Sequence, residues 1–212
     1  MNTNNIKLAV FDFDSTLMDG ETIDFLAKDY GIENEVKKIT QKAMAGEIDF
    51  FESLTYRISL LKGMEVKRVD EICQNLPFVK GAKDTITELK NKGYKVVCFS
   101  GGYKNATIPA KEKLGLDGEF SNILHSKNGY LTGLFGGEMC FSNSKGQMLK
   151  TLQSILGTDR TKTVVIGDGA NDLSMFKYAD TRIAFCAKEV LKKEATIIIE
   201  TKDLREILKT LK

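Results

Sequence analysis

Two short acidic motifs, each directly after an apolar run, constrain the fold of this 212-residue chain more than any other feature. The first, DFDST at residues 12–16, follows the run LAVF. The second, GDGAND at residues 167–172, follows the run TVVI. Short runs of β-branched or aromatic residues, bounded by polar residues and glycine, are typical of buried parallel strands. Because ligands collect at the carboxyl ends of such strands, we expect both motifs to line one crevice.

The remainder of the sequence alternates between helical and strand patterns. We expect a helix over 84–91, a strand over 94–99, a helix ending near residue 114, and strands over 182–185 and 196–199. This order predicts a doubly wound, mainly parallel α/β sheet. Pro109 should interrupt the helix that ends near residue 114, or delay its start. Three glycines separate short apolar runs in residues 130–141, which predicts a hairpin there.

The stretch from residue 22 to residue 74 differs, because its apolar residues have helical spacing and no strand pattern occurs between residues 34 and 73. Val36, Ile39 and Ala43 share one helical face, and a second face carries Phe51, Leu54, Ile58 and Leu61. We therefore predict two domains. Residues 1–17 and 77–212 form the α/β core, and residues 18–76 form an inserted α-helical cap.

Composition excludes several classes of function. The formal net charge is +2, and no basic block is interleaved with aromatic residues, so we expect no nucleic-acid partner. No apolar stretch approaches the length of a membrane span and no signal-peptide pattern is present, which predicts a cytoplasmic protein without a membrane partner. The chain has one histidine and no CxxC pair, which excludes a multi-histidine metal site. A small-molecule substrate is the remaining expectation.

The first acidic motif suggests phosphoryl transfer. Asp12 and Asp14 are two residues apart, so on an extended chain they face the same pocket. One carboxylate can attack phosphorus while the other handles the proton of the leaving alcohol. Mg²⁺ would offset the repulsion between carboxylate and phosphate, with Asp168 as a further ligand. A calcium-binding EF-hand loop is excluded, because Leu17 and Ile23 occupy the positions that need glycine and glutamate.

Three weaker patterns fit a phosphate site. Ser100–Gly102 follows the predicted strand 94–99, and such a turn offers a hydroxyl and backbone N–H groups, although an ordinary turn would look the same. Ser144 and Gln147 resemble a capping box, which places Lys145 at a helix start. Phe50 and Arg57 are seven residues apart, or two helical turns, so both can face one cavity. Without a phosphate site nearby, Lys145 would be interpreted as one of the many solvated surface lysines.

The chain resembles the phosphoserine phosphatases of the haloacid dehalogenase-like (HAD) superfamily over essentially its whole length. The segments that carry this resemblance occur in the family's order: DFDSTL, ETID, EVKKITQKAMAGEIDFFESLTYRISLLKG, FSGGY, KEKLGLD, NSKG, GDGANDLSMF, IAFCAK and DLREILK. The resemblance implies a Rossmann-like HAD core with a helical cap. It also implies that the protein is a monomer or a homodimer.

The resemblance implies a role for each candidate residue. Asp12 would be the nucleophile and Asp14 the general acid/base, and Mg²⁺ would be held by Asp12, the backbone carbonyl of Asp14, and Asp168. The phosphoryl oxygens would be held by Ser100, Gly101, Gly102 and Lys145, with Lys145 also balancing the nucleophile's charge. The supporting residues would be Asp172, Asn171 and Thr16, with Asn171 also counted among the substrate-binding residues.

Substrate choice would then lie in the cap. The resemblance places Glu21 against a substrate ammonium group and Arg57 against its carboxylate, with Met44 and Phe50 lining the cavity. The implied reaction is hydrolysis of O-phospho-L-serine to L-serine and phosphate through an aspartyl-phosphate, the last step of L-serine biosynthesis. Three alternatives stay open: another small phosphomonoester, phosphoryl transfer to an alcohol such as homoserine, and a non-catalytic phosphate-binding protein.

Overall fold

The computed structural model describes residues 6–44 and 46–211, and it confirms the predicted α/β class. In this described part, seven strands form one sheet in the order β4-β3-β2-β1-β5-β6-β7. All neighbouring strands run parallel except β3 and β4, which are antiparallel. The strands are β1 (Lys7–Asp12), β2 (Tyr94–Tyr103), β3 (Gly118–Lys127), β4 (Tyr130–Gly137), β5 (Thr163–Gly167), β6 (Thr181–Phe185) and β7 (Ile197–Ile199).

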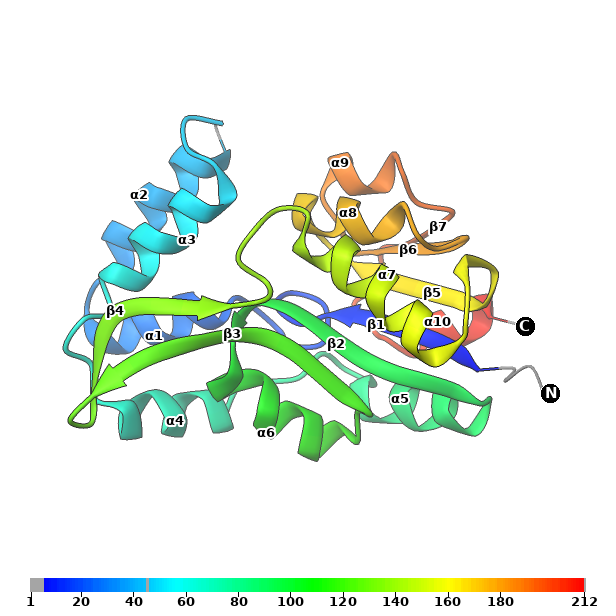
Figure 1. The fold of residues 1–212 in the computed structure, drawn as a ribbon, viewed down its shortest axis with the longest axis horizontal. Coiled ribbons are helices and arrows are strands. Elements are labelled where there is room, and N and C mark those ends of the chain that lie inside the picture. Colours follow the sequence, from blue (N-terminus) through cyan, green and yellow to red (C-terminus); the bar gives the residue numbers. More distant parts are fainter. Residues whose placement is uncertain (1–5, 45, 212) are drawn as a thin grey trace.

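Helices cover both faces of this sheet. Figure 1 shows α5 and α6 on one face and α7 and α8 on the other. Helices α1 to α4 lie between β1 and β2 in sequence. Among the described residues, no helix has the length and apolar character that a membrane crossing requires. The helices are α1 (Thr22–Tyr30), α2 (Glu33–Met44), α3 (Phe50–Ser59), α4 (Val66–Gln74), α5 (Ala82–Asn91), α6 (Lys104–Leu114), α7 (Ser144–Leu156), α8 (Leu173–Phe176), α9 (Glu189–Lys192) and α10 (Glu206–Thr210).

The central strand β1 is buried on both faces, as its continuous apolar run predicts. Leu8 and Val10 belong to one apolar cluster, together with Leu149 of α7. The alternate residues, Ala9 and Phe11, belong to a second cluster that includes residues of α5 and α6. β1 therefore lies in the middle of the domain. The chain adds β2, β3 and β4 on one side of β1 and then returns to add β5, β6 and β7 on the other side. This change of direction creates the crevice at the carboxyl end of the sheet.

Two strand predictions were wrong in detail. Ser100–Gly102 does not form a turn after residue 99, because β2 continues to Tyr103, whose buried side chain and pairing with Asn122 extend the strand. The predicted hairpin over 130–141 contains only its second strand. The first strand is β3, and the turn is Asn128–Gly129, where both residues have positive φ, as a two-residue hairpin turn of this sequence requires.

Two helix predictions also need correction. Pro109 neither interrupts nor delays its helix, since α6 runs unbroken from Lys104 to Leu114 with the proline inside it. The predicted capping box at Ser144 is absent: Asn143 is the N-cap residue, and the Ser144 hydroxyl instead accepts a hydrogen bond from the Phe141 N–H at 3.1 Å. The helix nevertheless starts where expected, so Lys145 lies in its first turn.

Helix α7 approaches α8 closely at Gly146. The Gly146 N–H donates to the Ser174 hydroxyl at 3.1 Å, and a Cβ atom at this glycine would lie 2.5 Å from the Ser174 carbonyl oxygen. Such a distance is far below van der Waals contact, and backbone atoms cannot rotate away as a side chain can. Gly146 therefore sets the spacing between the two helices, and with it the depth of Lys145.

We predict that Gly146→Ala destabilises the protein. Alanine normally favours a helix interior over glycine by about 1 kcal/mol, but overpacking against backbone costs about 1–3 kcal/mol. The free energy of unfolding, measured by urea denaturation, should therefore fall. Gly136→Ala is the matched control, because nothing lies within 4 Å of that Cβ position. A Gly146→Ala protein as stable as this control would contradict the close approach of α7 and α8.

Candidate active site

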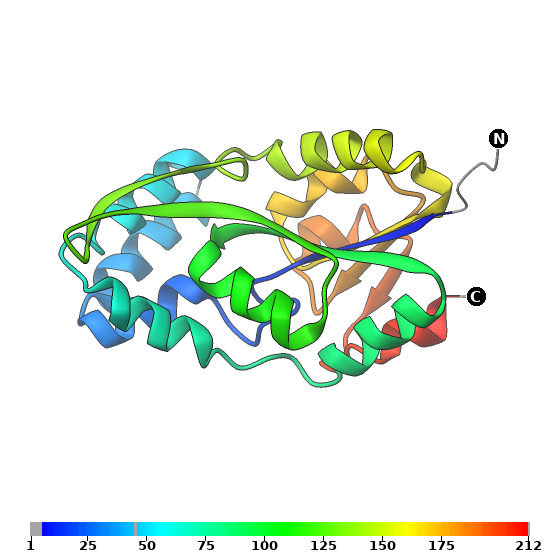
Figure 2. The same cartoon turned by 60° about the horizontal axis from the view of Figure 1, so that its bottom comes forward.

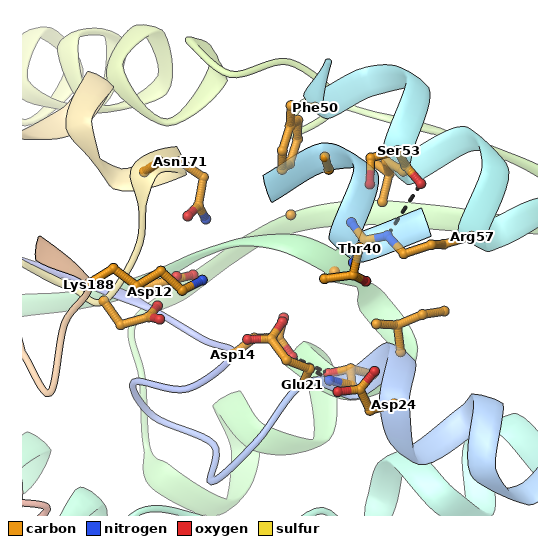
Figure 3. A pocket seen from close by; sticks show the side chains of 18 of the residues that line it. Asp12, Asp14, Glu21, Asp24, Thr40, Phe50, Ser53, Arg57, Asn171 and Lys188 are labelled. Carbon is orange, nitrogen blue, oxygen red and sulfur yellow. Dashed lines mark hydrogen bonds between the residues drawn. The ribbon is translucent and has the colours of Figure 1, made fainter. Parts of the chain in front are cut away.

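A cavity of about 530 Å³ opens at the carboxyl ends of three neighbouring strands. Asp12 is the last residue of β1, Asp168 directly follows β5, and Gly101 and Gly102 lie near the end of β2. All four line the cavity, together with Phe50 and other residues of helices α1 to α3. Figure 3 shows Asp12 on one side of the cavity and Phe50 on the other. The two acidic motifs thus meet in one crevice, as their positions after strands predict.

The floor of the site is a buried network of charges. The Lys145 ammonium lies 2.6 Å from Asp12 Oδ1 and 2.7 Å from Asp172 Oδ1. Asp172 Oδ2 also accepts hydrogen bonds from the backbone N–H groups of Asp168 and Gly169, at 3.0 and 3.1 Å. Asp172 therefore anchors the loop after β5 to α7, and Lys145 provides the positive charge between two carboxylates.

This burial shifts the ionisation of the network. Burial raises the pKa of Asp12 well above its ordinary value, and the charge of Asp172 adds to the effect despite the opposing ammonium of Lys145. Burial alone would lower the pKa of Lys145, but the charges of Asp12 and Asp172 outweigh it, so the net shift is upward. Lys145 is therefore firmly protonated. A cation beside Asp12 would favour the ionised form that a nucleophile needs.

Carboxylate oxygens of Asp12, Asp168 and Asp172 lie within 4.8 Å of one another, so together they could hold a cation. Burial and the charge of Asp172 raise the pKa of Asp168 to about 6, although the charges of Lys188 and Lys145 oppose this shift. Both oxygens of Asp172 already accept hydrogen bonds, which leaves Asp12 and Asp168 as the freer side-chain ligands. Hard oxygen donors of this kind suit Mg²⁺ or Ca²⁺. The donor set therefore fits the expected cofactor.

The side chain of Asp14 is held by the start of helix α1. Its Oδ1 accepts hydrogen bonds from the Thr22 N–H at 2.7 Å and the Thr22 hydroxyl at 2.6 Å. The first N–H groups of a helix lack partners within the helix, so Asp14 serves as a cap from outside the helix. The Ser100 hydroxyl lies 3.3 Å from Asp14 Oδ2 and accepts from the Gly102 N–H at 2.8 Å. Asp14 is thus fixed at the cavity wall.

Glu21 is oriented by the turn that follows Asp14. Ser15 has a left-handed backbone with φ of 58°, and its hydroxyl donates to Glu21 Oε1 at 2.9 Å. Burial, together with the charge of Asp14, raises the pKa of Glu21 to about 7. A buried carboxylate without a cation beside it would be stabilised by a ligand that brings a positive charge. Glu21 therefore lies in the cavity ready for such a ligand.

Helix α3 contributes the opposite wall. Phe50, Ser53 and Arg57 of this helix line the cavity, which agrees with the seven-residue spacing of the first and last. The Arg57 Nε–H donates to the Ser53 carbonyl oxygen at 3.3 Å, and no described carboxylate lies within ion-pair distance of its guanidinium. Figure 3 shows Arg57 and Phe50 across the cavity from Asp12. The guanidinium is thus available for an anionic group.

Several predicted site residues lie outside the cavity lining. Ser100, Lys145 and Asp172 are buried behind it, and Thr16 is buried with no hydrogen-bond partner for its hydroxyl among the described residues. The side chain of Met44 lies outside the described part of the structure, as do residues 1–5 of the predicted core. The lining does include Asp12, Asp14, Glu21, Phe50, Arg57, Gly101, Gly102, Asp168 and Asn171.

Sequence reasoning missed some lining residues. Ser53 lies three residues after Phe50 and four before Arg57, so helical spacing alone could have identified it. Asp24 lies three residues after Glu21 at the start of α1, with the same signal. Lys188 follows β6 and also lines the cavity; it is the last residue of the IAFCAK segment, but sequence reasoning gave it no role.

Comparison with known proteins gives one consistent result. A family model described as haloacid dehalogenase-like hydrolase matches residues 6–180. A protein of Wolinella succinogenes named phosphoserine phosphatase is 62% identical over 203 residues, which cover 96% of this chain and 98% of that protein.

Solved structures agree in fold. A structure described as a phospho-aspartyl intermediate analogue of phosphoserine phosphatase has a TM-score of 0.92 and 51% identity, covering 97% of this chain and 99% of that one. A substrate-bound phosphoserine phosphatase complex has a TM-score of 0.92 and 50% identity, covering 97% and 98%. The sequence match, the shared fold and the paired acidic motifs agree: the chain belongs to the haloacid dehalogenase-like hydrolase family.

Proposed function

We propose that this chain hydrolyses O-phospho-L-serine to L-serine and phosphate. The observation that carries the proposal is the distribution of charge in one cavity: Asp12 and Asp168 lie on the sheet side, while Glu21 and Arg57 lie on the helix side. A phosphate ester at the first pair would present its amino-acid group to the second. Relatives and neighbours named phosphoserine phosphatase support this substrate. Nothing in the comparisons favours phosphoryl transfer to homoserine or a non-catalytic role.

The reaction would proceed in two displacements. In the first, a carboxylate oxygen of Asp12 bonds to phosphorus, the bond from phosphorus to the serine oxygen breaks, and Asp14 gives its proton to that oxygen. In the second, Asp14 removes a proton from water, the water oxygen bonds to phosphorus, and the bond to Asp12 breaks to release phosphate. The first displacement leaves Asp14 deprotonated, as the second requires, and the second displacement protonates Asp14 again.

The phosphoryl group would be held by positive charge and backbone donors. Lys145 balances the charge of Asp12, so that an anionic nucleophile can approach an anionic phosphate. Gly101 and Gly102 would offer N–H groups, and Ser100 and Asn171 would add polar contacts; Thr16 and Asp172 would support the site from behind. When bound, a metal ion supplies additional positive charge at the phosphate oxygens. We propose Mg²⁺ as that ion, held by Asp12, Asp168 and the backbone carbonyl of Asp14.

Substrate recognition would come from residues 18–76 acting as a cap domain over the core of residues 1–17 and 77–212. Glu21 would bind the ammonium group, and Arg57 the carboxylate, through charge-assisted hydrogen bonds. Phe50 and Met44 would provide apolar walls, and closure of the cap would exclude water. We further propose a cytoplasmic monomer or homodimer, in keeping with a role in serine biosynthesis.

Phosphate release from a panel of esters tests this function. The panel contains phosphoserine, phosphothreonine, phosphoethanolamine and p-nitrophenyl phosphate, each with Mg²⁺ and with a chelator. We expect phosphoserine to have the highest kcat/KM and the chelator to abolish release. Preference for another ester would discard the proposed substrate but keep the mechanism. No release from any ester would contradict phosphatase activity.

Arg57→Ala should impair phosphoserine hydrolysis selectively. A hydrogen bond to a charged group contributes about 1.5–3 kcal/mol, so kcat/KM for phosphoserine should fall by about ten- to a hundredfold. Phosphoethanolamine lacks the carboxylate, and its kcat/KM should change little. Arg68→Ala is a matched control, since Arg68 pairs with Asp29 and Glu71 outside the cavity. Equal losses on both substrates would contradict the assignment of Arg57 to the carboxylate.

The preference for the ammonium group should depend on pH. Because the pKa of Glu21 is raised to about 7, its carboxylate is charged above that pH and neutral below it. The comparison substrate is 3-(phosphonooxy)propanoate, which lacks the amino group. The ratio of kcat/KM for phosphoserine to that for this analogue should fall by up to about tenfold from about pH 8 to about pH 6. In Glu21→Gln the ratio should be low and flat. A ratio independent of pH in the wild type would contradict the role of Glu21.

A further inference from the structure

The inner and outer faces of helix α3 carry different groups. Its inner face lines the cavity with Phe50, Ser53, Leu54 and Arg57. Phe51, the neighbour of Phe50, lies on the outer face and is 40% exposed, although its spacing with buried Leu54 suggested a core position. The positions of Arg57 and Phe50 in the cavity therefore depend on what holds α3 against the sheet.

The connection from α3 to α4 is joined to the hairpin β3–β4 by main-chain hydrogen bonds. The Gly63 N–H donates to the Leu131 carbonyl at 2.8 Å, the Leu131 N–H donates to the Met64 carbonyl at 2.9 Å, and the Val66 N–H donates to the Gly129 carbonyl at 2.9 Å. Figure 1 shows the tip of this hairpin beside the start of α4, and Figure 2 shows the same arrangement from another side. The segment that follows α3 is therefore held by bonds that do not depend on side chains.

The N-terminal end of α3 is held differently. The Phe51 ring stacks on Phe141 with centroids 5.2 Å apart and an interplanar angle of 18°, and it meets Phe135 of β4 at 5.9 Å. Phe141 is 58% exposed, so these contacts are open to water. Among the described residues, no hydrogen bond or ion pair joins Phe50–Ser59 to β3 or β4. Apolar contacts therefore join this part of α3 to the hairpin, in addition to the packing of buried Leu54 in the main apolar cluster.

We propose that Phe51, Phe135 and Phe141 form an aromatic latch that positions α3 over the catalytic site, with the main-chain bonds of Gly63, Met64 and Val66 as the hinge. The proposal rests on the proposed function, because it concerns the residues that recognise phosphoserine. Opening the latch moves Phe50 and Arg57 away from the sheet while the hinge stays paired. The three rings are positioning residues and do not touch the substrate.

The latch also connects α3 to the charge network. Phe141 lies four residues before Lys145, and its backbone N–H donates to the hydroxyl of Ser144, the first residue of α7. The ring that holds the substrate-recognising helix thus belongs to the segment that leads into the catalytic lysine. When α3 closes, this one segment therefore aligns α3 with Lys145.

A double-mutant cycle tests the latch. Phe51→Leu and Phe141→Leu each keep an apolar side chain but lose ring stacking, and each should raise KM for phosphoserine about three- to tenfold. The double variant should be no worse than the more affected single variant, because both changes break the same contact. We expect kcat to stay the same or rise, since opening becomes easier. Phe51→Tyr should restore a KM near that of the wild type.

Two comparisons separate positioning from general damage. Tyr56→Leu is the matched control, because Tyr56 lies on the same helix, is 50% exposed and does not line the cavity. It should leave KM unchanged. Hydrolysis of p-nitrophenyl phosphate, which has no carboxylate for Arg57, should also be unaffected in the latch variants. Additive effects of the two substitutions, or equal losses on both substrates, would overturn the proposal.

Hydrogen exchange gives a readout that does not need phosphoserine activity. In Phe141→Leu, amides in the first two turns of α3 should exchange faster than in the wild type, while those of Gly63 and Val66 should keep their protection. Unchanged exchange in α3 would overturn the latch even if phosphoserine is the substrate. Faster exchange in a protein that does not hydrolyse phosphoserine would keep the latch and reject the proposed function.

Discussion

The buried ammonium of Lys145 between Asp12 and Asp172 is the interaction on which the site depends. Removing ions from water is costly, and a buried charge is tolerated only when it is paired and hydrogen-bonded. Here one cation is shared by two carboxylates, and Asp172 uses its second oxygen to bind the backbone of the loop after β5. The geometry of this network requires α7 to approach α8, which only glycine at position 146 permits. A packing constraint between two helices therefore places the charge of Lys145 beside Asp12, the proposed nucleophile.

In the proposed function, the reaction takes place at the strand ends of the sheet, and helix α3 contributes to substrate recognition. The ends of β1, β2 and β5 are rigid because their strands are buried and paired on both sides. Helix α3 has no paired strands beside it: Leu54 and Ile58 are buried in the main apolar cluster, main-chain bonds hold the segment that follows the helix, and exposed rings contact its first turn. In the proposed function, Asp12 and Asp14 would thus stay fixed, while Phe50 and Arg57 would move to admit the substrate. Rigid catalytic groups and a movable wall are what a site needs if it must both exclude water and release product.

The sequence predicts those parts of the fold that depend on local pattern. Apolar runs identify β1 and β5, and the acidic residues that follow them identify the crevice. Contacts between distant segments were not predictable: the extension of β2 through Ser100 depends on pairing with β3, and the exposure of Phe51 depends on where Phe141 lies. The capping box expected of Ser144 and Gln147 is absent because the Ser144 hydroxyl accepts a hydrogen bond from the Phe141 N–H instead. Lys188 ends the IAFCAK segment, but its place in the cavity was not predicted because it depends on how β6 packs in the folded protein.

The most direct test of the account is to identify the residue that carries the phosphoryl group. The protein would be mixed with phosphoserine and Mg²⁺, quenched in acid and treated with borohydride, which reduces an acyl phosphate to an alcohol. Peptide mass spectrometry would then locate the change. The account predicts that Asp12, and no other residue, is converted to homoserine, because a covalent aspartyl-phosphate forms there. Modification of a different carboxylate, or turnover with no trapped intermediate at Asp12, would contradict it.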